Sequence, residues 1–236
     1  MKLTIIHYTV LVVALVVVFV LNNRKAQQAP PQSNNLTKTR SRPPGSVDAT
    51  PDEPTPFGYK CIWFAIKSTN ADDVVKEIGL KSPVPCNWKS GIAAAYEGGV
   101  FVSPAVDGWT LVIGQDLPTL DDAGDRRKQT DLLLVKLSQH FGETQHFGTH
   151  RVSDFHAWAK ALNGKIVREF AYVAGEEKLC DVGDMTDEEH SAGLTNSPDF
   201  FVNENHVMKV AEKWSLDPCK LTSKSAEKGV GWLGNL

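Results

Sequence analysis

The pattern of apolar and polar positions divides the chain into three parts, of which the first is the most distinctive. An almost unbroken apolar run extends from Leu3 to Leu21, and residues 10–21 (VLVVALVVVFVL) contain no polar side chain. A helix rises about 1.5 Å per residue, so this run would span roughly 28 Å, close to the ~30 Å hydrocarbon core of a bilayer. We therefore predict that residues 1–21 form a single-pass transmembrane helix, an uncleaved signal anchor that contacts the lipid bilayer through residues 3–21.

Two other interpretations of the apolar run stay open. A cleaved secretory signal has an apolar region of about 7–15 residues followed by a small-x-small site, but no such site adjoins Leu21. A buried helix of a soluble protein is the other alternative. Five basic residues lie between residues 22 and 56, against Lys2 alone before the run, which favours a cytoplasmic globular domain. Short Met-Lys starts also occur on segments that insert in the opposite orientation.

The second part, residues 22–56, has almost no apolar side chains and contains seven of the thirteen prolines. Such a segment cannot bury enough apolar surface to fold, so we predict a disordered Pro-rich linker. The third part, residues 57–236, has the apolar content of one globular domain. Its pattern also permits two related halves, at about 57–142 and 143–236, although no residue-level repeat joins them.

In the first half of the domain, the pattern of apolar and polar residues predicts four strands and two helices. Asn70 and Gly79 are the N-cap and C-terminal stop of the first helix, and Gly142 is the stop of the second. Residues 80–98 are rich in Pro and Gly, which predicts an irregular segment with at most one helical turn. The predicted strands are 59–66, 99–103, 109–114 and 143–152, and the second helix covers 126–141. The order is β-α-β-β-α-β, typical of a ferredoxin-like fold.

The second half extends this pattern with further β-α-β-β-α elements. A short helix is predicted from Ser153 or Asp154 to Leu162, because Phe155, Trp158, Ala159 and Leu162 recur at helical spacing. A strand at 165–173, a hairpin partner at 177–182, a helix opened by the Thr186–Glu189 capping box and a helix capped by Asn203 follow. The C-terminal residues 229–234 either pack on the domain or dock a partner. The predicted fold class is therefore α+β, an antiparallel sheet with helices on one face.

Composition excludes one class of partner. The globular domain carries 19 basic and 25 acidic residues, a net charge near −6, and has no Lys/Arg-rich stripe with interleaved aromatic residues. A polyanion requires a cationic surface, so we predict no nucleic-acid binding. The four cysteines form no C-x-x-C pair, which removes the common redox and zinc motifs. Four free thiols are expected in the cytoplasm, whereas two disulfides are possible after export.

The densest group of candidate chemistry is a histidine cluster. Four of the seven histidines, His140, His146, His150 and His156, fall within seventeen residues that also contain Asp154. On a strand, His146 and His150 would lie about 13 Å apart, too far to share one metal ion. We therefore predict no metal and no cofactor.

The remaining chemistry of this cluster is acid–base. His150 or His156 held by Asp154 could serve as a general base, and Arg151 could bind an anion. No nucleophile motif accompanies them, and satisfied or surface histidines are the structural alternative. Asp107 and Trp109 form a second candidate binding site, a loop with an aromatic platform. The structural alternative is a turn whose Trp109 joins the core.

These observations support two classes of function. The first is a membrane-tethered interaction or ligand-binding module without catalytic activity, whose partner is a protein or a small ligand at the membrane. The second is a membrane-anchored hydrolase that uses His150, Asp154 and His156. A third possibility is a protein that binds a neighbouring toxin or enzyme, as inhibitors do.

Overall fold

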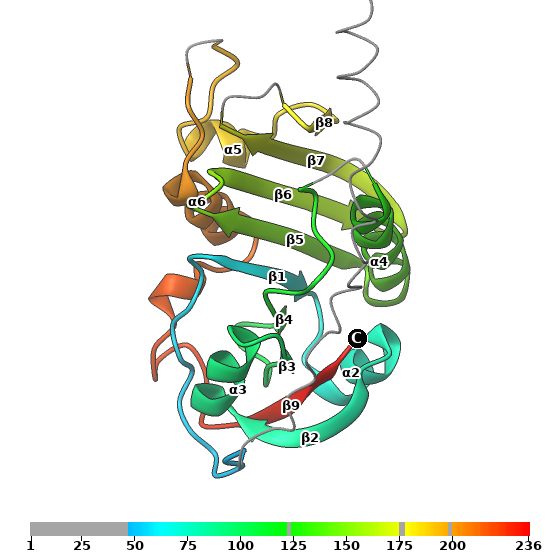
Figure 1. Cartoon of the computed structure of the whole chain (residues 1–236), viewed down its shortest axis with the longest axis vertical. Coiled ribbons are helices and arrows are strands. Elements are labelled where there is room, and N and C mark those ends of the chain that lie inside the picture. The colour runs from blue at the N-terminus through cyan, green and yellow to red at the C-terminus, as the bar shows by residue number, and fades with distance from the viewer. Residues whose placement is uncertain (1–46, 122–123, 175–177, 198–199) are drawn as a thin grey trace, which may run out of the picture. The chain divides into compact units, whose positions relative to one another are not determined.

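Nine strands form one antiparallel sheet in the computed structural model, which describes residues 47–121, 124–174, 178–197 and 200–236 (Figure 1). The strands are β1 (Cys61–Ile66), β2 (Lys81–Asn87), β3 (Val100–Val102), β4 (Thr110–Ile113), β5 (Glu143–His150), β6 (Phe155–Leu162), β7 (Lys165–Val173), β8 (Cys180–Val182) and β9 (Val230–Asn235). The helices are α2 (Ala71–Ile78), α3 (Trp88–Ala95), α4 (Asp125–Phe141), α5 (Asp187–Ser191), α6 (Glu204–Trp214) and a 3₁₀ turn, η1 (Pro218–Lys220). The domain therefore has the predicted α+β class.

The strand order of the sheet is β2-β9-β3-β4-β1-β5-β6-β7-β8, and every neighbouring pair is antiparallel. Strands from both predicted halves thus share one sheet. Between residues 59 and 152 the chain adds β2 and α3, which the predicted β-α-β-β-α-β order does not contain. The C-terminal β9 inserts between β2 and β3, so residues 229–234 pack on the domain as part of the sheet.

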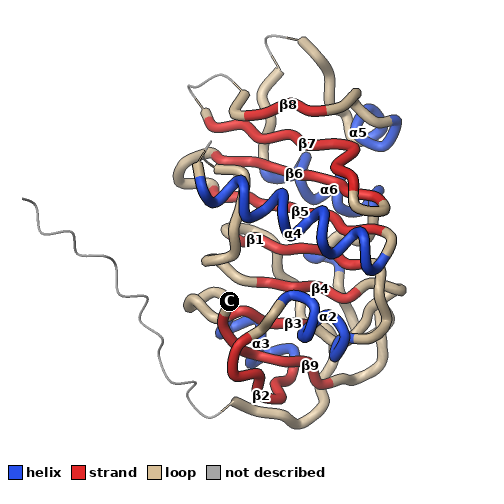
Figure 2. Tube along the Cα trace, turned by 90° about the vertical axis from the view of Figure 1, so that its right-hand side faces the viewer, coloured by secondary structure: helices blue, strands red, loops and turns tan. Residues whose placement is uncertain are grey.

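Helices cover both faces of the sheet, which corrects the prediction of helices on one face. Helices α2 and α4 lie on one face, and α3, α5 and α6 lie on the other (Figures 1 and 2). Strand β1 shows why two layers are needed, because Trp63 packs into one apolar cluster and Phe64 into the other. We refer to these sides of the sheet as the α6 face and the α4 face.

Local signals in the sequence set several helix ends as predicted. The side chain of Asn70 accepts hydrogen bonds from the backbone N–H groups of Asp72 and Asp73, and Gly79 ends α2 in the left-handed conformation at φ 77°. Thr186 and Glu189 form the predicted capping box of α5. Each device satisfies backbone groups that the helix itself leaves unpaired.

The predicted helix from residue 153 or 154 to 162 is wrong, because these residues form strand β6. Strand β6 pairs with β5 on one side and with β7 on the other, and its side chains are buried on both faces. A central strand with two buried faces carries apolar residues at almost every position, so helical spacing occurs among them by coincidence. Tertiary pairing then overrides the helix propensity of its alanines.

The prediction of an irregular segment at 80–98 is also wrong, because β2 and α3 occupy most of it. Strand β2 contains Pro83 and Pro85 and lies at the edge of the sheet, the one place where prolines do not remove needed hydrogen bonds. Helix α3 begins where Asp52 accepts hydrogen bonds from the backbone N–H groups of Trp88 (2.7 Å) and Lys89 (3.0 Å). Residues 47–56, assigned to the linker by composition, therefore contact the domain.

No helix among the described residues is long and apolar enough to cross a membrane. The predicted anchor at residues 3–21 and the linker up to residue 46 lie outside the described residues. The anchor consequently stays a prediction.

Candidate functional site

The histidine cluster is gathered by the tight connection between β5 and β6. His156 is buried, and its Nε2 lies 3.0 Å from Oδ1 of Asp154 while its Nδ1 lies 3.1 Å from Oγ1 of Thr149. A carboxylate only accepts hydrogen bonds, so Nε2 carries the proton and Nδ1 accepts from the Thr149 hydroxyl. Asp154 and His156 are thus two of the predicted candidate residues in contact, and Thr149 comes opposite His156 through the β5–β6 register.

His150 and Arg151 have different partners. The exposed His150 has its Nδ1 3.1 Å from Oγ of Ser153, within the same turn. Arg151 lies 3.4 Å from a carboxylate oxygen of Glu204 on α6, and its guanidinium lies 5.3 Å from the ring centre of Tyr59. The structure thus joins Asp154 with His156, and it places His150 and Arg151 in separate contacts.

The contacts of His156 have the form of a hydroxyl–imidazole–carboxylate chain, but its hydroxyl is inaccessible. Thr149 is only 1% exposed, so a substrate atom cannot reach its Oγ1 without opening the hairpin. Burial lowers the pKa of His156, and the hydrogen bond and charge of Asp154 offset part of that effect. Both ring nitrogens are already bonded, so the arrangement serves to stabilise a neutral buried histidine.

The other histidines of the cluster lie elsewhere. His146 is buried on the α4 face with its ring centre 5.0 Å from that of Phe64, and burial lowers its pKa to about 3. His140 is in the last turn of α4, where Nδ1 lies 3.9 Å from a carboxylate oxygen of Glu77. Among the described residues, no group of three His, Cys, Asp or Glu side chains is arranged to hold a metal ion.

The second predicted site, at Asp107 and Trp109, is a turn with a buried tryptophan. Asp107 and Gly108 have positive φ angles of 50° and 82°, and Val106 and Trp109 pair across the turn. Trp109 packs in the apolar cluster of the α6 face with 5% of its surface exposed. The ammonium of Lys67 lies 4.3 Å from its ring centre. These contacts match the structural alternative for the loop.

A cavity of about 230 Å³ lies on the α6 face, at the end of the sheet formed by β6, β7 and β8. Its floor comes from β6 and β7, and its walls come from the segments before and after α5. The residues that line it are Trp158, Arg168, Phe170, Tyr172, Lys178, Met185, Leu194, Thr195, Asn196, Ser197, Phe200 and Val202. We call it the Arg168 cavity.

Strand pairing builds the floor of the Arg168 cavity. Trp158 on β6 is directly opposite Phe170 on β7, and their rings stack with centres 4.5 Å apart. A register shift between Lys160 and Ala161 of β6 breaks the expected alternation along β7. Ile166 therefore packs on the α4 face, and Arg168 lies on the α6 face with Phe170. A strand with unbroken alternation would instead have both Ile166 and Arg168 on the same face.

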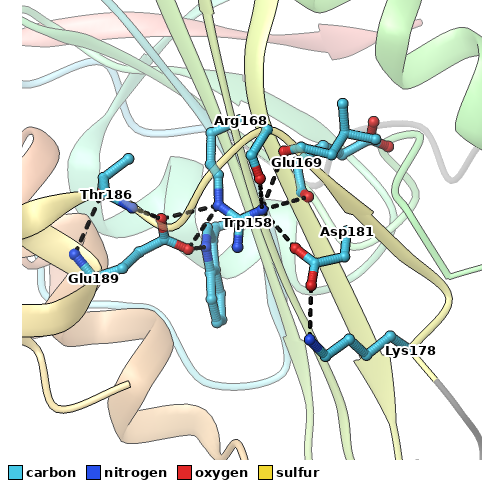
Figure 3. A network of polar contacts seen from close by, with 9 residues as sticks. Trp158, Arg168, Glu169, Lys178, Asp181, Thr186 and Glu189 are labelled. Atoms are coloured by element: carbon cyan, nitrogen blue, oxygen red, sulfur yellow. Dashed lines mark hydrogen bonds and ion pairs between the residues drawn. The ribbon is translucent and has the colours of Figure 1, made fainter. Parts of the chain in front are cut away.

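Arg168 is the centre of an ion-pair network (Figure 3), in which Arg168 and Glu189 are buried while Asp181 and Lys178 form the exposed end. Its Nε donates to both carboxylate oxygens of Glu189 at 2.9 Å, and its Nη1 donates to Oδ1 of Asp181 at 2.6 Å. Trp158 also donates to Glu189, through Nε1 at 2.7 Å, and Lys178 donates to the other oxygen of Asp181 at 2.6 Å. The network therefore links β6, β7, β8 and α5.

Backbone carbonyls complete the binding of Nη1. The carbonyl oxygens of Val182 and Gly183 each accept from Nη1 at 3.0 Å. Gly183 has a φ of 76°, and a Cβ at this position would lie 2.3 Å from the carbonyl oxygen of Val167, so only glycine allows this close approach. The chain after β8 is thereby held against the bulged part of β7.

The network favours the charged forms of Arg168 and Asp181. Burial opposes the charge of Arg168, but the hydrogen bonds of Glu189 and Asp181 outweigh it and raise the pKa of the guanidinium. For Asp181 burial acts to raise the pKa, and the hydrogen bonds of Lys178 and Arg168 outweigh it and lower the pKa. Two cations and two carboxylates thus face one another, and their formal charges cancel.

The Arg168 cavity was not predicted from the sequence. One signal was present, because an arginine on an otherwise apolar strand face beside Phe170 must either reach solvent or find carboxylates. Its partners, Asp181 and Glu189, come 13 and 21 residues later in the chain, so only the fold reveals them. No protein-family model, curated protein or solved structure matches this chain.

Proposed function

We propose that this chain is a membrane-tethered ligand-binding protein, and that its domain takes a small molecule into the Arg168 cavity. The observation that carries this proposal is the combination of an aromatic floor with a charged, hydrogen-bonded guanidinium in one hollow. Ligand sites in proteins are typically concave and mainly apolar, with few well-placed polar groups. The described residues of the Arg168 cavity have this composition.

The ion-pair network of Arg168 supports binding more than catalysis. Arg168 is held by Glu189, by Asp181 and by backbone carbonyls, so its position is set before any ligand arrives. A preorganised donor reduces the entropy lost on binding. The cavity lining offers Lys178 as a further basic group, but this amine is already paired with Asp181.

The hydrolase hypothesis receives less support from the geometry. Among the described residues, His150 makes no hydrogen bond or ion pair with His156 or Asp154, and the Thr149 hydroxyl is buried. The Arg168 cavity is lined by none of the three residues that this hypothesis uses. A ligand-binding role without catalysis is therefore the function we favour.

The tether and the orientation of the domain belong to the same proposal. The apolar run at residues 3–21 has the length to span a bilayer. All four cysteines are free, and burial raises the pKa of three of them, Cys61, Cys86 and Cys180, to about 12. Free thiols agree with the cytoplasmic side, which the basic residues after the run also favour.

We also propose a ferredoxin-like unit within the sheet, made of β1, β3, β4 and β5 with α2 and α4. The four strands are neighbours in the order β3-β4-β1-β5, and the two helices lie on the same face. In this interpretation β2, α3 and the strands beyond β5 are additions to that unit. The Arg168 cavity then lies entirely in the added part, on β6 and β7.

The binding proposal is tested by filling the cavity. Full-length protein in nanodiscs is screened against small aromatic compounds by ligand-observed saturation-transfer NMR. Ser197→Trp places a large ring in the lining, and Ser223→Trp, at an exposed position outside the lining, is the matched control. We expect compounds that bind the wild-type protein and the control but not Ser197→Trp. An absence of binders, or binders that Ser197→Trp retains, would overturn the proposal.

The tether is tested separately by membrane extraction. Membranes that contain the full-length chain are washed with alkaline carbonate, which releases peripheral proteins. We expect the chain to stay in the pellet and a variant without residues 3–21 to be released. Recovery of the intact chain in the carbonate supernatant would show that the apolar run does not hold it in lipid.

A further inference from the structure

Among the described residues, one edge of the Arg168 guanidinium has no hydrogen-bond partner. The six hydrogen bonds of this side chain all start from Nε or Nη1, and no described residue accepts from Nη2. Figure 3 shows this terminal nitrogen without a dashed line, close to Trp158. Because Arg168 lines the cavity, Nη2 offers its donors to a ligand there.

The size and the floor of the cavity favour a planar ring. A cavity of about 150 Å³ in another protein holds benzene, so about 230 Å³ accommodates one six-membered ring with a small polar group. Trp158 and Phe170 provide a stacked aromatic floor, and Tyr172 and Phe200 add two further rings to the lining. Aromatic rings prefer to stack in an offset manner or to meet edge to face.

The charge around Nη2 decides between a neutral and an anionic ligand. Arg168 is already shared by two carboxylates, Glu189 and Asp181, and Lys178 brings the sum of the four charges to zero. The other described residues of the lining are uncharged. A carboxylate ligand would therefore enter as an uncompensated negative charge, whereas a neutral carbonyl could accept from Nη2 without this penalty.

We propose that the Arg168 cavity selects a neutral planar ring bearing a carbonyl acceptor over the corresponding carboxylate. The carbonyl oxygen accepts from Nη2 of Arg168, and the ring lies against Trp158 and Phe170. An amide nitrogen on the same group can donate to side-chain oxygens of the polar segment Thr195–Asn196–Ser197. This inference rests on the proposed function, because it names the ligand class of the same cavity.

The test compares benzamide with benzoate, which have nearly the same shape and differ in charge. Their dissociation constants are measured at pH 7 with full-length protein in nanodiscs, by ligand-observed NMR titration. We expect benzamide to bind the wild-type protein at least about tenfold more tightly than benzoate. Equal or tighter binding of benzoate would overturn the inference and leave the binding proposal intact.

Two variants alter the charge around Arg168 in opposite directions. Asp181→Asn removes one carboxylate and frees Lys178, so we expect the preference for benzamide to fall to about parity or reverse. Lys178→Met leaves a net negative charge, so we expect the preference to rise. Asp184→Asn removes a nearby exposed carboxylate that has no bond to Arg168 and serves as the matched control, with a wild-type ratio.

The outcomes separate the two proposals. Suppose that neither benzamide nor benzoate binds, but that other aromatic compounds bind the wild-type protein and not Ser197→Trp. The proposed ligand class is then wrong, and the cavity is still a binding site. If the panel contains no binder, the binding proposal fails with it. A benzamide preference that stays unchanged in both Asp181→Asn and Lys178→Met would refute the charge argument.

Discussion

Two buried basic side chains on neighbouring strands, His156 on β6 and Arg168 on β7, meet the cost of burial in opposite ways. His156 loses its charge, since burial lowers its pKa, and it satisfies both nitrogens with Thr149 and Asp154. Arginine cannot deprotonate in a protein, so Arg168 is surrounded by Glu189, Asp181 and backbone carbonyls. Both ring nitrogens of His156 are hydrogen-bonded, whereas Nη2 of Arg168 has no partner in the part of the chain that the structure describes and lies on a side chain that lines a cavity.

This difference shows why a dense histidine cluster was a poor guide to the site. A buried histidine can satisfy both ring nitrogens with hydrogen-bond partners that are close in the sequence. Here these partners, Thr149 and Asp154, lie within seven residues of His156 in the chain. A buried guanidinium has five N–H donors and needs partners from several elements. Such a network holds neighbouring strands and loops together. In this domain two of the strands that it holds, β6 and β7, form the floor of the Arg168 cavity.

The largest predicted effect comes from breaking the Arg168 network. Glu189→Ala removes the acceptor of Arg168, of Trp158 Nε1 and of the backbone N–H of Thr186. The change leaves a buried guanidinium with one carboxylate fewer, so we expect the free energy of unfolding to fall by about 3–5 kcal/mol. Chemical denaturation of the full-length chain in detergent, followed by tryptophan fluorescence, measures this loss.

A substitution in the same helix provides the control. Asp187→Ala removes an exposed carboxylate from the first turn of α5, where it interacts with the helix dipole, so we expect a loss below about 1 kcal/mol. If Glu189→Ala costs no more than Asp187→Ala, the network does not stabilise the fold. The comparison between His156 and Arg168 would then lose its basis.

Short-range signals in the sequence predicted much of the fold. The cap of α2 at Asn70, its stop at Gly79 and the capping box of α5 depend on residues within a few positions of each other. Strand β6 could not be recognised in this way, because its assignment depends on pairing with β5 and β7 on both sides. The β6 residues Trp158 and Ala159 fit a helical face as well as a strand with two buried faces.

The same limit explains the candidate site. Thr186 and Glu189 predicted a helix start, but nothing local to them shows that the carboxylate of Glu189 is buried against Arg168 and Trp158. The face of Arg168 depends on the register shift between β6 and β7. An alternating pattern cannot reveal such a shift, since one bulged residue moves every later side chain to the opposite face.

The second prediction uses pH to separate buried histidines from the buried arginine. His146 has a pKa of about 3 in the folded chain because of burial, against about 6.5 when unfolded. As the pH falls below about 6.5, only the unfolded chain binds this proton, so the free energy of unfolding falls by about 1.4 kcal/mol per pH unit. Arg168 stays charged in both states and contributes no such slope.

His146→Leu tests this assignment without adding a polar group to the core. We expect the variant to have a shallower dependence of stability on pH between about 6.5 and 4 than the wild-type protein, as measured by urea denaturation at each pH. His146 packs edge to face with Phe64, so some change of stability at pH 7 is expected in addition. Identical slopes for the two proteins would show that His146 does not cause the acid sensitivity.

The smallest predicted effect concerns Asp154, the partner of His156. Its carboxylate raises the pKa of His156 against the effect of burial, so Asp154→Asn is expected to lower that pKa further. An NMR titration of the His156 ring measures the change, and an unchanged or higher pKa would contradict the contact. Asp154 is 53% exposed, so the loss of stability at pH 7 should stay below about 1 kcal/mol. A lower folded-state pKa also widens the acid range in which only the unfolded chain binds the proton, so the variant loses slightly more stability there.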